Sequence, residues 1–180
     1  MDIPERKPNR LPNFDYSSPG VYFITICVEG KLCILADIVG GGALDAPQAH
    51  LTPLGKIVET YILSGNCVPH IRVDKYVIMP NHIHLLIAVD SDGTSKTPSP
   101  TNAVIPHFVS TFKRFCHRDA GAKIFQRSYH DHVVRGEKDY LKIWEYIDNN
   151  PAKWEEDCFY PIQPPRGVEG AAPYNILLED

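Results

Sequence analysis

Two histidines separated by one residue are the clearest candidates for chemistry in this sequence. His82 and His84 stand in the run Asn81-His82-Ile83-His84-Leu85-Leu86, with apolar residues between and after them. Side chains alternate between the two faces of a β-strand, so both imidazoles would project from one face and Ile83 from the other. Two neutral imidazoles on a rigid strand provide half of a divalent-metal site. Taken alone, such a pair is more often structural, so the other half must come from elsewhere in the chain.

A predicted helix at 137–150 carries the second group of candidates. Its apolar positions recur with helical spacing, and Pro151 ends the pattern. At about 100° per residue the apolar stripe comprises Tyr140, Ile143, Trp144 and Ile147. Tyr146 and Asn150 lie one turn apart at the edge of that stripe. Without other information, the favoured interpretation is a core-edge residue for the tyrosine and an ordinary helix end for the asparagine.

These two groups, brought together, would suit a phosphoryl transesterification. The imidazoles of His82 and His84 and the amide oxygen of Asn150 would hold Mg²⁺ or Mn²⁺ with open coordination positions. A metal polarises a scissile phosphate, and the Tyr146 phenol would be the nucleophile. The resulting phosphotyrosine bond conserves the energy of the broken phosphodiester, so the strand can later be rejoined.

The charge distribution leaves a local anionic ligand open, although the whole chain has a formal net charge of −4. Between Ala103 and Lys142 there are eight lysines and arginines against four acidic residues, whereas the sequence after Lys142 is strongly acidic. A basic segment within an acidic chain can serve an anionic partner, or it can simply be a solvated helix face.

Composition indicates a globular cytoplasmic protein. The chain is 43% hydrophobic and 22% charged over 180 residues, which suits one domain with tails. No apolar run approaches the roughly 20 residues of a membrane span, and the polar N-terminus does not resemble a secretory signal. The five cysteines are odd in number and lack a C-x-x-C pair, which argues against a disulfide framework or zinc knuckle.

Residue patterns predict five strands and three helices. Strands are expected at 21–28, 32–38, 73–79, 82–89 and 128–135, the first two joined as a hairpin through Gly30-Lys31. Helices are expected at 53–63, 103–117 and 137–150, the first opened by a Thr52-Pro53 cap signal. Loops are expected at 39–50 and 91–102. This order predicts an α+β fold with a mainly antiparallel sheet.

The ordered set of motifs resembles one protein family. The strings Met79-Pro80-Asn81-His82-Ile83-His84 and Tyr146-Ile147-Asp148-Asn149-Asn150-Pro151 resemble the HUH single-tyrosine transposases, in particular the REP-associated tyrosine transposase branch. Further similar strings are Asp15-Tyr16-Ser17, Gly20-Val21-Tyr22-Phe23-Ile24-Thr25, Phe112-Lys113, Tyr129-His130-Asp131-His132-Val133-Val134-Arg135 and Asn149-Asn150-Pro151-Ala152-Lys153-Trp154. The resemblance covers roughly residues 10–157.

The resemblance implies an RRM/ferredoxin-like antiparallel sheet flanked by helices, with the histidines on a central strand. It implies His82, His84 and Asn150 as ligands of Mg²⁺ or Mn²⁺ and Tyr146 as the nucleophile. The substrate would be single-stranded DNA bearing a hairpin, cut to a 5′-phosphotyrosine and a free 3′-OH. We expect one catalytic domain at 1–157 and a Pro-rich acidic tail at 158–180, in a bacterial-type, nucleoid-associated protein that is a monomer or homodimer.

Four basic residues are candidate phosphate contacts by charge alone, namely Lys113, Arg114, Arg135 and Lys142. The pair His130 and His132 is a rival metal site, although no candidate nucleophile follows it at a spacing that would indicate a shared active site. The loops at 39–48 and 91–102 and the low overall charge depart from the family pattern and bear on DNA recognition.

Two other functions remain open at this level. One is a domesticated hairpin-DNA-binding protein with little catalysis. The other is an RRM-like RNA-binding module with an incidental histidine pair, which is disfavoured because no exposed aromatic pattern of that kind stands out.

Overall fold

A four-stranded antiparallel sheet with the strand order β4-β5-β1-β6 forms the centre of the protein. The computed structural model describes residues 18–41, 46–90 and 104–161. The strands are β1 (Gly20–Cys27), β4 (Ile71–Ile78), β5 (His82–Val89) and β6 (His130–Val133). The strand with both histidines is therefore central, as the family resemblance implies.

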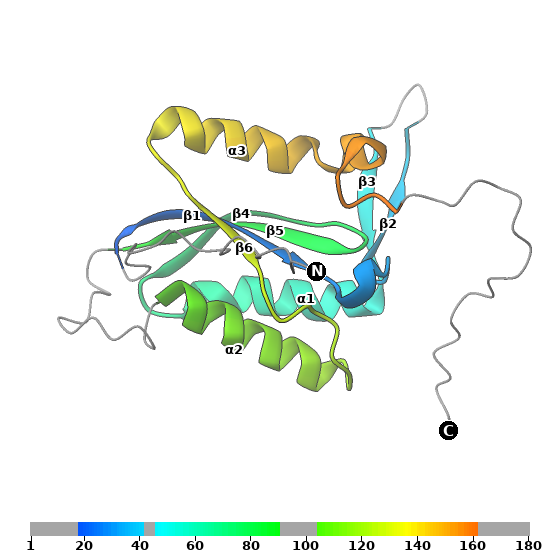
Figure 1. Cartoon of the computed structure of the whole chain (residues 1–180), viewed down its shortest axis with the longest axis horizontal. Coiled ribbons are helices and arrows are strands. Elements are labelled where there is room, and N and C mark those ends of the chain that lie inside the picture. The colour runs from blue at the N-terminus through cyan, green and yellow to red at the C-terminus, as the bar shows by residue number, and fades with distance from the viewer. Residues whose placement is uncertain (1–17, 42–45, 91–103, 162–180) are drawn as a thin grey trace, which may run out of the picture.

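Three helices cover the two faces of this sheet unequally. They are α1 (Pro53–Ser64), α2 (Val104–Asp119) and α3 (Glu137–Asn149). Figure 1 shows α1 and α2 on one face and α3 alone on the other. The order β1-α1-β4-β5-α2-β6 with this strand arrangement is the ferredoxin-like βαββαβ pattern, so the predicted fold class is confirmed. In that pattern one sheet face lacks helices, and here α3 covers it.

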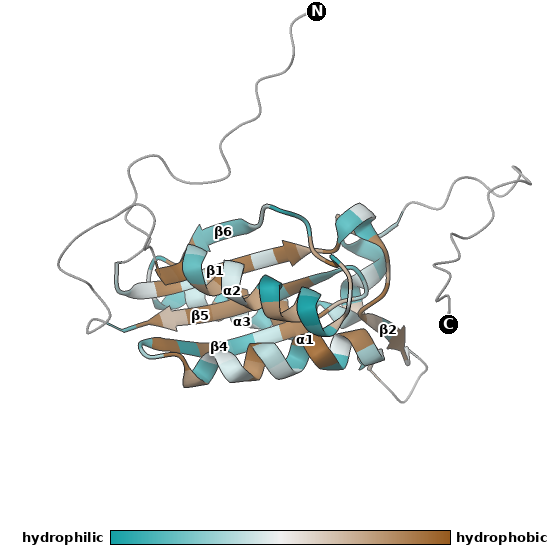
Figure 2. Cartoon of the chain, turned by 90° about the horizontal axis from the view of Figure 1, so that it is seen from below, coloured by the Kyte–Doolittle hydropathy of each residue, from teal (hydrophilic) through white to brown (hydrophobic). Residues whose placement is uncertain are grey.

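Both faces of β5 are consequently buried along its whole length. Ile83, Leu85 and Ile87 pack in the main core with α1 and α2, whereas Leu86 packs on the opposite face with α3. Figure 2 shows the central strands β1 and β5 as mostly hydrophobic and the edge strand β6 as hydrophilic. This two-sided burial explains why the sequence after His84 is a continuous apolar run rather than an alternating one.

The expected hairpin between residues 21–28 and 32–38 is wrong. Strand β1 pairs with β5 and β6, and β2 (Ala36–Val39) pairs with β3 (Gln48–Leu51) instead. The chain does turn at η1 (Glu29–Lys31), but Ile34 and Leu35 then donate to the Pro80 carbonyl. Non-local pairing wins because it gives β1 partners on both edges. The loop expected at 39–50 ends by Gln48, and the loop expected at 91–102 lies outside the described residues.

The start of α1 follows the predicted cap. The Thr52 hydroxyl accepts from the Gly55 N–H at 3.1 Å, and Pro53 begins the helix. Gly55 has a packing reason as well, because a Cβ built there would lie 2.0 Å from the Leu35 carbonyl oxygen. The cap thus joins α1 closely to the segment before β2.

The end of α3 matters most for function. Asn150 is the C-cap residue, as expected for a helix ended by Pro151. The chain then forms the 3₁₀ helix η4 (Pro151–Glu156) and turns back, so that Phe159 contacts His82 on β5. Residues just beyond α3 therefore reach the histidines.

Candidate functional site

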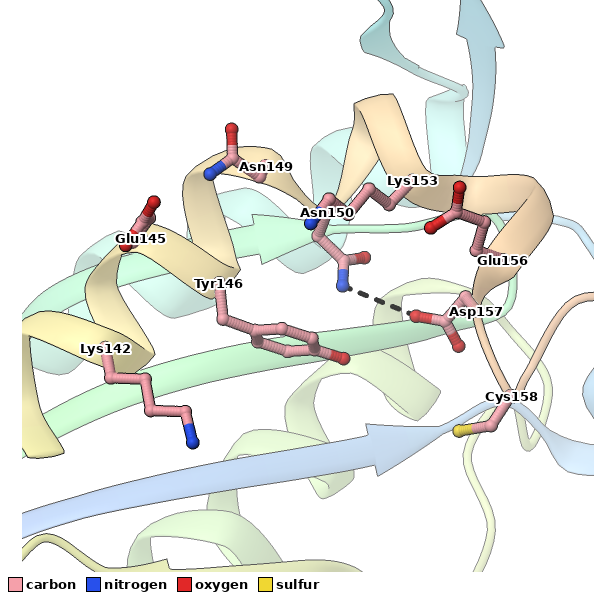
Figure 3. Close-up of a pocket in the computed structure, with 9 residues that line it drawn as sticks. All are labelled: Lys142, Glu145, Tyr146, Asn149, Asn150, Lys153, Glu156, Asp157 and Cys158. Carbon is pink, nitrogen blue, oxygen red and sulfur yellow. Dashed lines mark hydrogen bonds between the residues drawn. The ribbon is translucent and has the colours of Figure 1, made fainter.

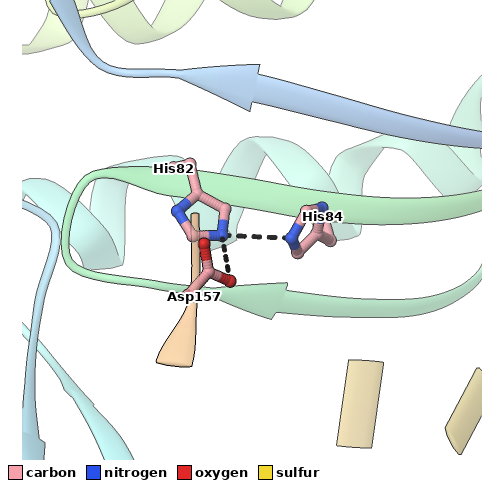
Figure 4. A group of neighbouring side chains, drawn as sticks. All are labelled: His82, His84 and Asp157. Carbon is pink, nitrogen blue, oxygen red and sulfur yellow. Dashed lines mark hydrogen bonds and ion pairs between the residues drawn. The ribbon is translucent and has the colours of Figure 1, made fainter. Parts of the chain in front are cut away.

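The two histidines face each other on the side of β5 that α3 covers. Their Nε2 atoms lie 3.0 Å apart, and both side chains are buried (Figure 4). The alternation of the strand sends Ile83 into the opposite core, as the sequence predicts. The His-x-His spacing therefore does create a convergent pair of imidazoles.

A hydrogen bond at the Nδ1 atom of each ring orients the pair. Asn81 Nδ2 donates to the carbonyls of Lys31 and Phe159, at 3.3 and 2.8 Å, which leaves Oδ1 facing His82 Nδ1 at 2.9 Å. His82 must then carry its proton on Nδ1, so its Nε2 has a free lone pair. The Thr25 hydroxyl lies 2.8 Å from His84 Nδ1 and can donate or accept there. Metal-binding histidines are typically oriented by such partners.

Burial keeps both imidazoles neutral. It lowers the pKa of His82 to about 4, an effect that the nearby Asp157 carboxylate opposes. The pKa of His84 is lowered well below its usual value by burial and, to a smaller extent, by the proximity of His82. Neutral imidazoles at neutral pH have lone pairs available for a cation.

Asp157 is the site residue that sequence reasoning missed. Potential ligand atoms of His82, His84 and Asp157 all lie within 4.8 Å of one another, with Asp157 Oδ2 3.9 Å from His82 Nε2. Among the described residues, this is the one group of three or more His, Cys, Asp or Glu side chains close enough to share a metal ion. Nothing in the sequence distinguishes Asp157 from its acidic neighbours Glu155 and Glu156. The chain turns back toward β5 after η4, and no residue pattern predicts that turn.

Tyr146 extends from α3 toward His84, and Asn150, at the C-cap of the same helix, lies beside Asp157. The Tyr146 hydroxyl lies 3.3 Å from His84 Nε2, and the side chain is 43% exposed. Asn150 is buried, and its Nδ2 donates to Asp157 at 3.4 Å. Both line a cavity of about 440 Å³ that also reaches Asp157 (Figure 3). A phenol accessible from solvent therefore stands directly beside a buried polar cluster.

The surroundings of Tyr146 keep its phenol protonated. Burial raises its pKa above the usual 10, and the charge of Asp157 acts in the same direction. A hydrogen bond from Asn150 opposes both effects. Any use of this oxygen as a nucleophile therefore requires additional positive charge nearby.

The donor set fits a divalent cation. The Asn150 Oδ1 atom is buried without a hydrogen-bond partner, which is costly for an amide oxygen unless something else satisfies it. The Nδ2 atom of the same amide lies 3.4 Å from Asp157, whose carboxylate groups with the two neutral imidazoles of His82 and His84. These nitrogen and oxygen donors suit Mn²⁺ or Mg²⁺. His82, His84 and Asn150 would hold such an ion, which when bound would polarise a phosphate and stabilise a phenolate.

The four predicted phosphate contacts lie in different places. Lys142 lines the same cavity as Tyr146, and Arg135 is exposed just before α3. Arg114 is exposed on α2, across the sheet from the histidines, with its guanidinium over the Phe115 ring. Lys153, which was not predicted, lines the cavity with Lys142.

Lys113 is buried, and its ammonium group is fully hydrogen-bonded within the protein. Its Nζ donates to the carbonyls of Gln126, Arg127 and Ser128, at 2.7, 3.3 and 2.9 Å. An ammonium has three N–H groups, so these bonds use all of them. Lys113 therefore ties α2 to the segment before β6, and it has no N–H group left for a phosphate.

One member of the rival histidine pair has another role. His132 Nε2 lies 2.8 Å from Asp139 Oδ2, which also accepts from the Arg135 N–H at 2.9 Å. Neither His130 nor His132 belongs to a potential metal cluster in the described part of the chain. His132 instead joins β6 to the first turn of α3.

Comparisons with known proteins agree with the sequence resemblance at the level of fold. No protein-family model matches the sequence. The solved structure of a REP-associated tyrosine transposase bound to a REP hairpin is similar with a TM-score of 0.54 and 18% identity, covering 86% of this chain and 74% of that one. A proposed transposase from Deinococcus radiodurans is similar over 78% of this chain and 97% of its own, at 19% identity, but its TM-score of 0.41 supports no argument.

The chain thus has the fold of the REP-associated tyrosine transposase. A protein of Haemophilus influenzae, described only as uncharacterized, is 35% identical in an alignment that covers 88% of this chain and 94% of the relative. The chain belongs to the same protein family as that Haemophilus influenzae protein. Within the described residues, no helix has the length and apolar character needed to cross a bilayer.

Proposed function

We propose that this protein is a metal-dependent transposase of the HUH single-tyrosine class, which nicks and joins single-stranded DNA at hairpins. One observation carries the proposal: the Tyr146 hydroxyl lies 3.3 Å from Nε2 of His84, in a cluster of donors suited to a divalent ion. The similar fold of a REP-associated tyrosine transposase supports a DNA substrate, and its bound REP hairpin supports a hairpin in particular.

The reaction is a transesterification at phosphorus. The Tyr146 oxygen loses its proton and attacks the phosphate, and the bond from phosphorus to the 3′ oxygen of the preceding nucleotide breaks. That oxygen leaves as a 3′-OH after gaining a proton, and the 5′ phosphate stays on Tyr146. Attack by a 3′-OH on the phosphotyrosine reverses the sequence and joins strands without an external energy source.

The geometry of the cavity supports this assignment of roles. Tyr146 is accessible from the cavity, while the donors beside it are buried, so a phosphate could approach the phenol at the edge of a polar cluster. Lys142 and Lys153 line the same cavity and place positive charge where a DNA backbone would pass. The acidic Glu145 and Glu156 also line the cavity, so both positive and negative side chains border the proposed path of the DNA strand.

The proposal is tested by trapping the covalent product. Hairpin-bearing single-stranded DNA, selected for binding from a pool with randomised flanks, is incubated with the protein and Mn²⁺ or Mg²⁺, then resolved under denaturing conditions. We expect a protein–DNA adduct that carries a label placed 3′ of the cut and lacks one placed 5′ of it. Tyr146→Phe should remove the adduct, and Tyr140→Phe should retain it because Tyr140 bonds to Asp74 on the side of the core.

The result separates this function from its alternative. Tight hairpin binding with no adduct on any selected sequence, in either metal, would favour a domesticated DNA-binding protein. Adduct formation by Tyr146→Phe would show that the nucleophile is another residue.

A further inference from the structure

We propose that Asp157 is the carboxylate ligand of the metal site, delivered to the histidines by the chain segment 151–161, which Asn81 anchors. This inference rests on the metal-dependent function proposed above and deepens it. It adds a charged ligand to a set that, on sequence grounds, comprises two imidazoles and an amide. It also gives a function to residues that composition assigns to the start of a tail.

The position of Asp157 is unlike that of its acidic neighbours. Its side chain is only 4% exposed, whereas Glu155 and Glu156 are exposed on the same segment. Its Oδ1 accepts from the Phe159 N–H at 2.7 Å, and its Oδ2 lies 3.9 Å from His82 Nε2 and 3.4 Å from Asn150 Nδ2. One oxygen thus secures the local turn while the other faces the ligand cluster (Figure 4).

The segment is fixed to the histidine strand by several contacts. Asn81 Nδ2 donates to the Phe159 carbonyl at 2.8 Å, and Asn81 Oδ1 accepts from His82. The rings of Phe159 and Trp154 pack against His82, with centroids 4.6 and 6.0 Å from that of the imidazole. The residue that orients His82 therefore also holds the segment that carries Asp157, which makes Asn81 a positioning residue for two ligands.

The charge of a bound divalent cation explains why a carboxylate ligand is favourable at this site. A buried divalent cation surrounded by only neutral imidazoles and an amide would have no compensating charge, which is unfavourable away from water. One carboxylate supplies it. Two histidines with one carboxylate also form a set that favours transition metals such as Mn²⁺ over Mg²⁺, which prefers oxygen ligands.

The test measures binding of Mn²⁺ alone, without DNA. Metal-free wild-type protein, Asp157→Asn and Glu156→Gln are titrated with Mn²⁺ at constant pH, and free Mn²⁺ is followed by electron paramagnetic resonance. We expect the affinity of Asp157→Asn to fall by at least 10-fold. Glu156→Gln should stay within about 2-fold of wild type, since it removes the same charge from the same cavity without touching the cluster.

A second measurement does not depend on any variant folding. Wild-type protein labelled with ¹³C at its aspartate carboxylates is loaded with Mn²⁺ and examined by electron–nuclear double resonance. A directly bound carboxylate should give a strong ¹³C hyperfine coupling. Absence of that coupling, or an Asp157→Asn affinity equal to wild type, would overturn the proposal.

The outcomes also separate this inference from the proposed function. If wild type binds Mn²⁺ and forms the adduct while Asp157→Asn binds equally well, only the role of Asp157 falls. If wild type binds no Mn²⁺, both the metal-dependent function and the carboxylate ligand are contradicted.

Discussion

The hydroxyl of Tyr146 and Nε2 of His84 lie 3.3 Å apart, although 62 positions separate the two residues in the chain. The contact arises because α3 covers the sheet face that the ferredoxin-like pattern leaves without helices. The tyrosine and both histidines come from one polypeptide, so a single chain brings these three side chains together. A second copy is not required to place Tyr146 beside His84.

Thr25 is expected to tune metal affinity through His84. Replacing it by valine removes the hydroxyl 2.8 Å from Nδ1 while keeping a β-branched side chain suited to β1. We expect Mn²⁺ affinity to fall about 10-fold, since partners of metal-bound histidines typically contribute that much. Thr60→Val, on the exposed face of α1, is the control. Equal affinities for the two variants would argue that the hydroxyl does not orient the ring.

Lys142 is expected to contact a DNA phosphate. Lys142→Ala should weaken hairpin binding and reduce the slope of log affinity against log salt by about 1, as expected for one lost phosphate contact. Lys123 pairs with Glu29, and its alanine variant serves as the control. An unchanged salt slope for Lys142→Ala would place the DNA path away from this side of the cavity.

Lys113 is expected to stabilise the fold rather than bind DNA. Lys113→Met leaves three carbonyls without their buried donor, so the free energy of unfolding should fall by about 2–4 kcal/mol. Arg114→Met, at the adjacent exposed position, should change it by less than about 0.5 kcal/mol. Urea unfolding measures both. A normal stability for Lys113→Met would contradict this role.

The metal-free protein is expected to lose stability on mild acidification. The pKa of His82 is about 4 in the folded state and about 6.5 when the chain is unfolded, so the unfolded state binds more protons between these values. The free energy of unfolding therefore falls as pH decreases from about 6.5 toward 4, by about 3 kcal/mol from His82 alone, and is unaffected by this group above that window. Burial of His84 acts in the same direction.

Urea unfolding in EDTA at several pH values measures this effect. Carboxylates contribute to the same window, so the informative quantity is the difference between wild type and His82→Gln. The variant should show the shallower dependence. Parallel curves would mean that His82 is not held neutral in the fold.

Much of the site follows from local sequence patterns. Alternation along β5 predicts that the two imidazoles share a face, and helical spacing predicts that Tyr146 and Asn150 share an edge of α3. Both are short-range consequences of backbone geometry. The apolar runs likewise predict β1, α1, β4, β5, α2, β6 and α3 in this order, although they add a hairpin partner for β1 at 32–38.

What could not be predicted depends on non-local contacts. The pairing of β2 with β3 replaces a plausible local hairpin because β1 takes β5 and β6 as its partners. Asp157 reaches the histidines only because Phe159 and Asn81 hold the chain after η4 against β5. The three hydrogen bonds from Lys113 to backbone carbonyls could not be predicted either. A lysine in a basic segment has the same local sequence whether it is solvated or buried.

The most direct test of the central claim is to locate the covalent bond by mass spectrometry. Protein that has reacted with a cleavable hairpin is digested with nuclease and then trypsin, and the peptide Ile143–Lys153 is examined, in which Tyr146 is the single tyrosine. The account predicts a nucleotide attached to Tyr146 through its 5′ phosphate. A nucleotide on any other residue, or an unmodified peptide from protein that has demonstrably cut its substrate, would contradict it.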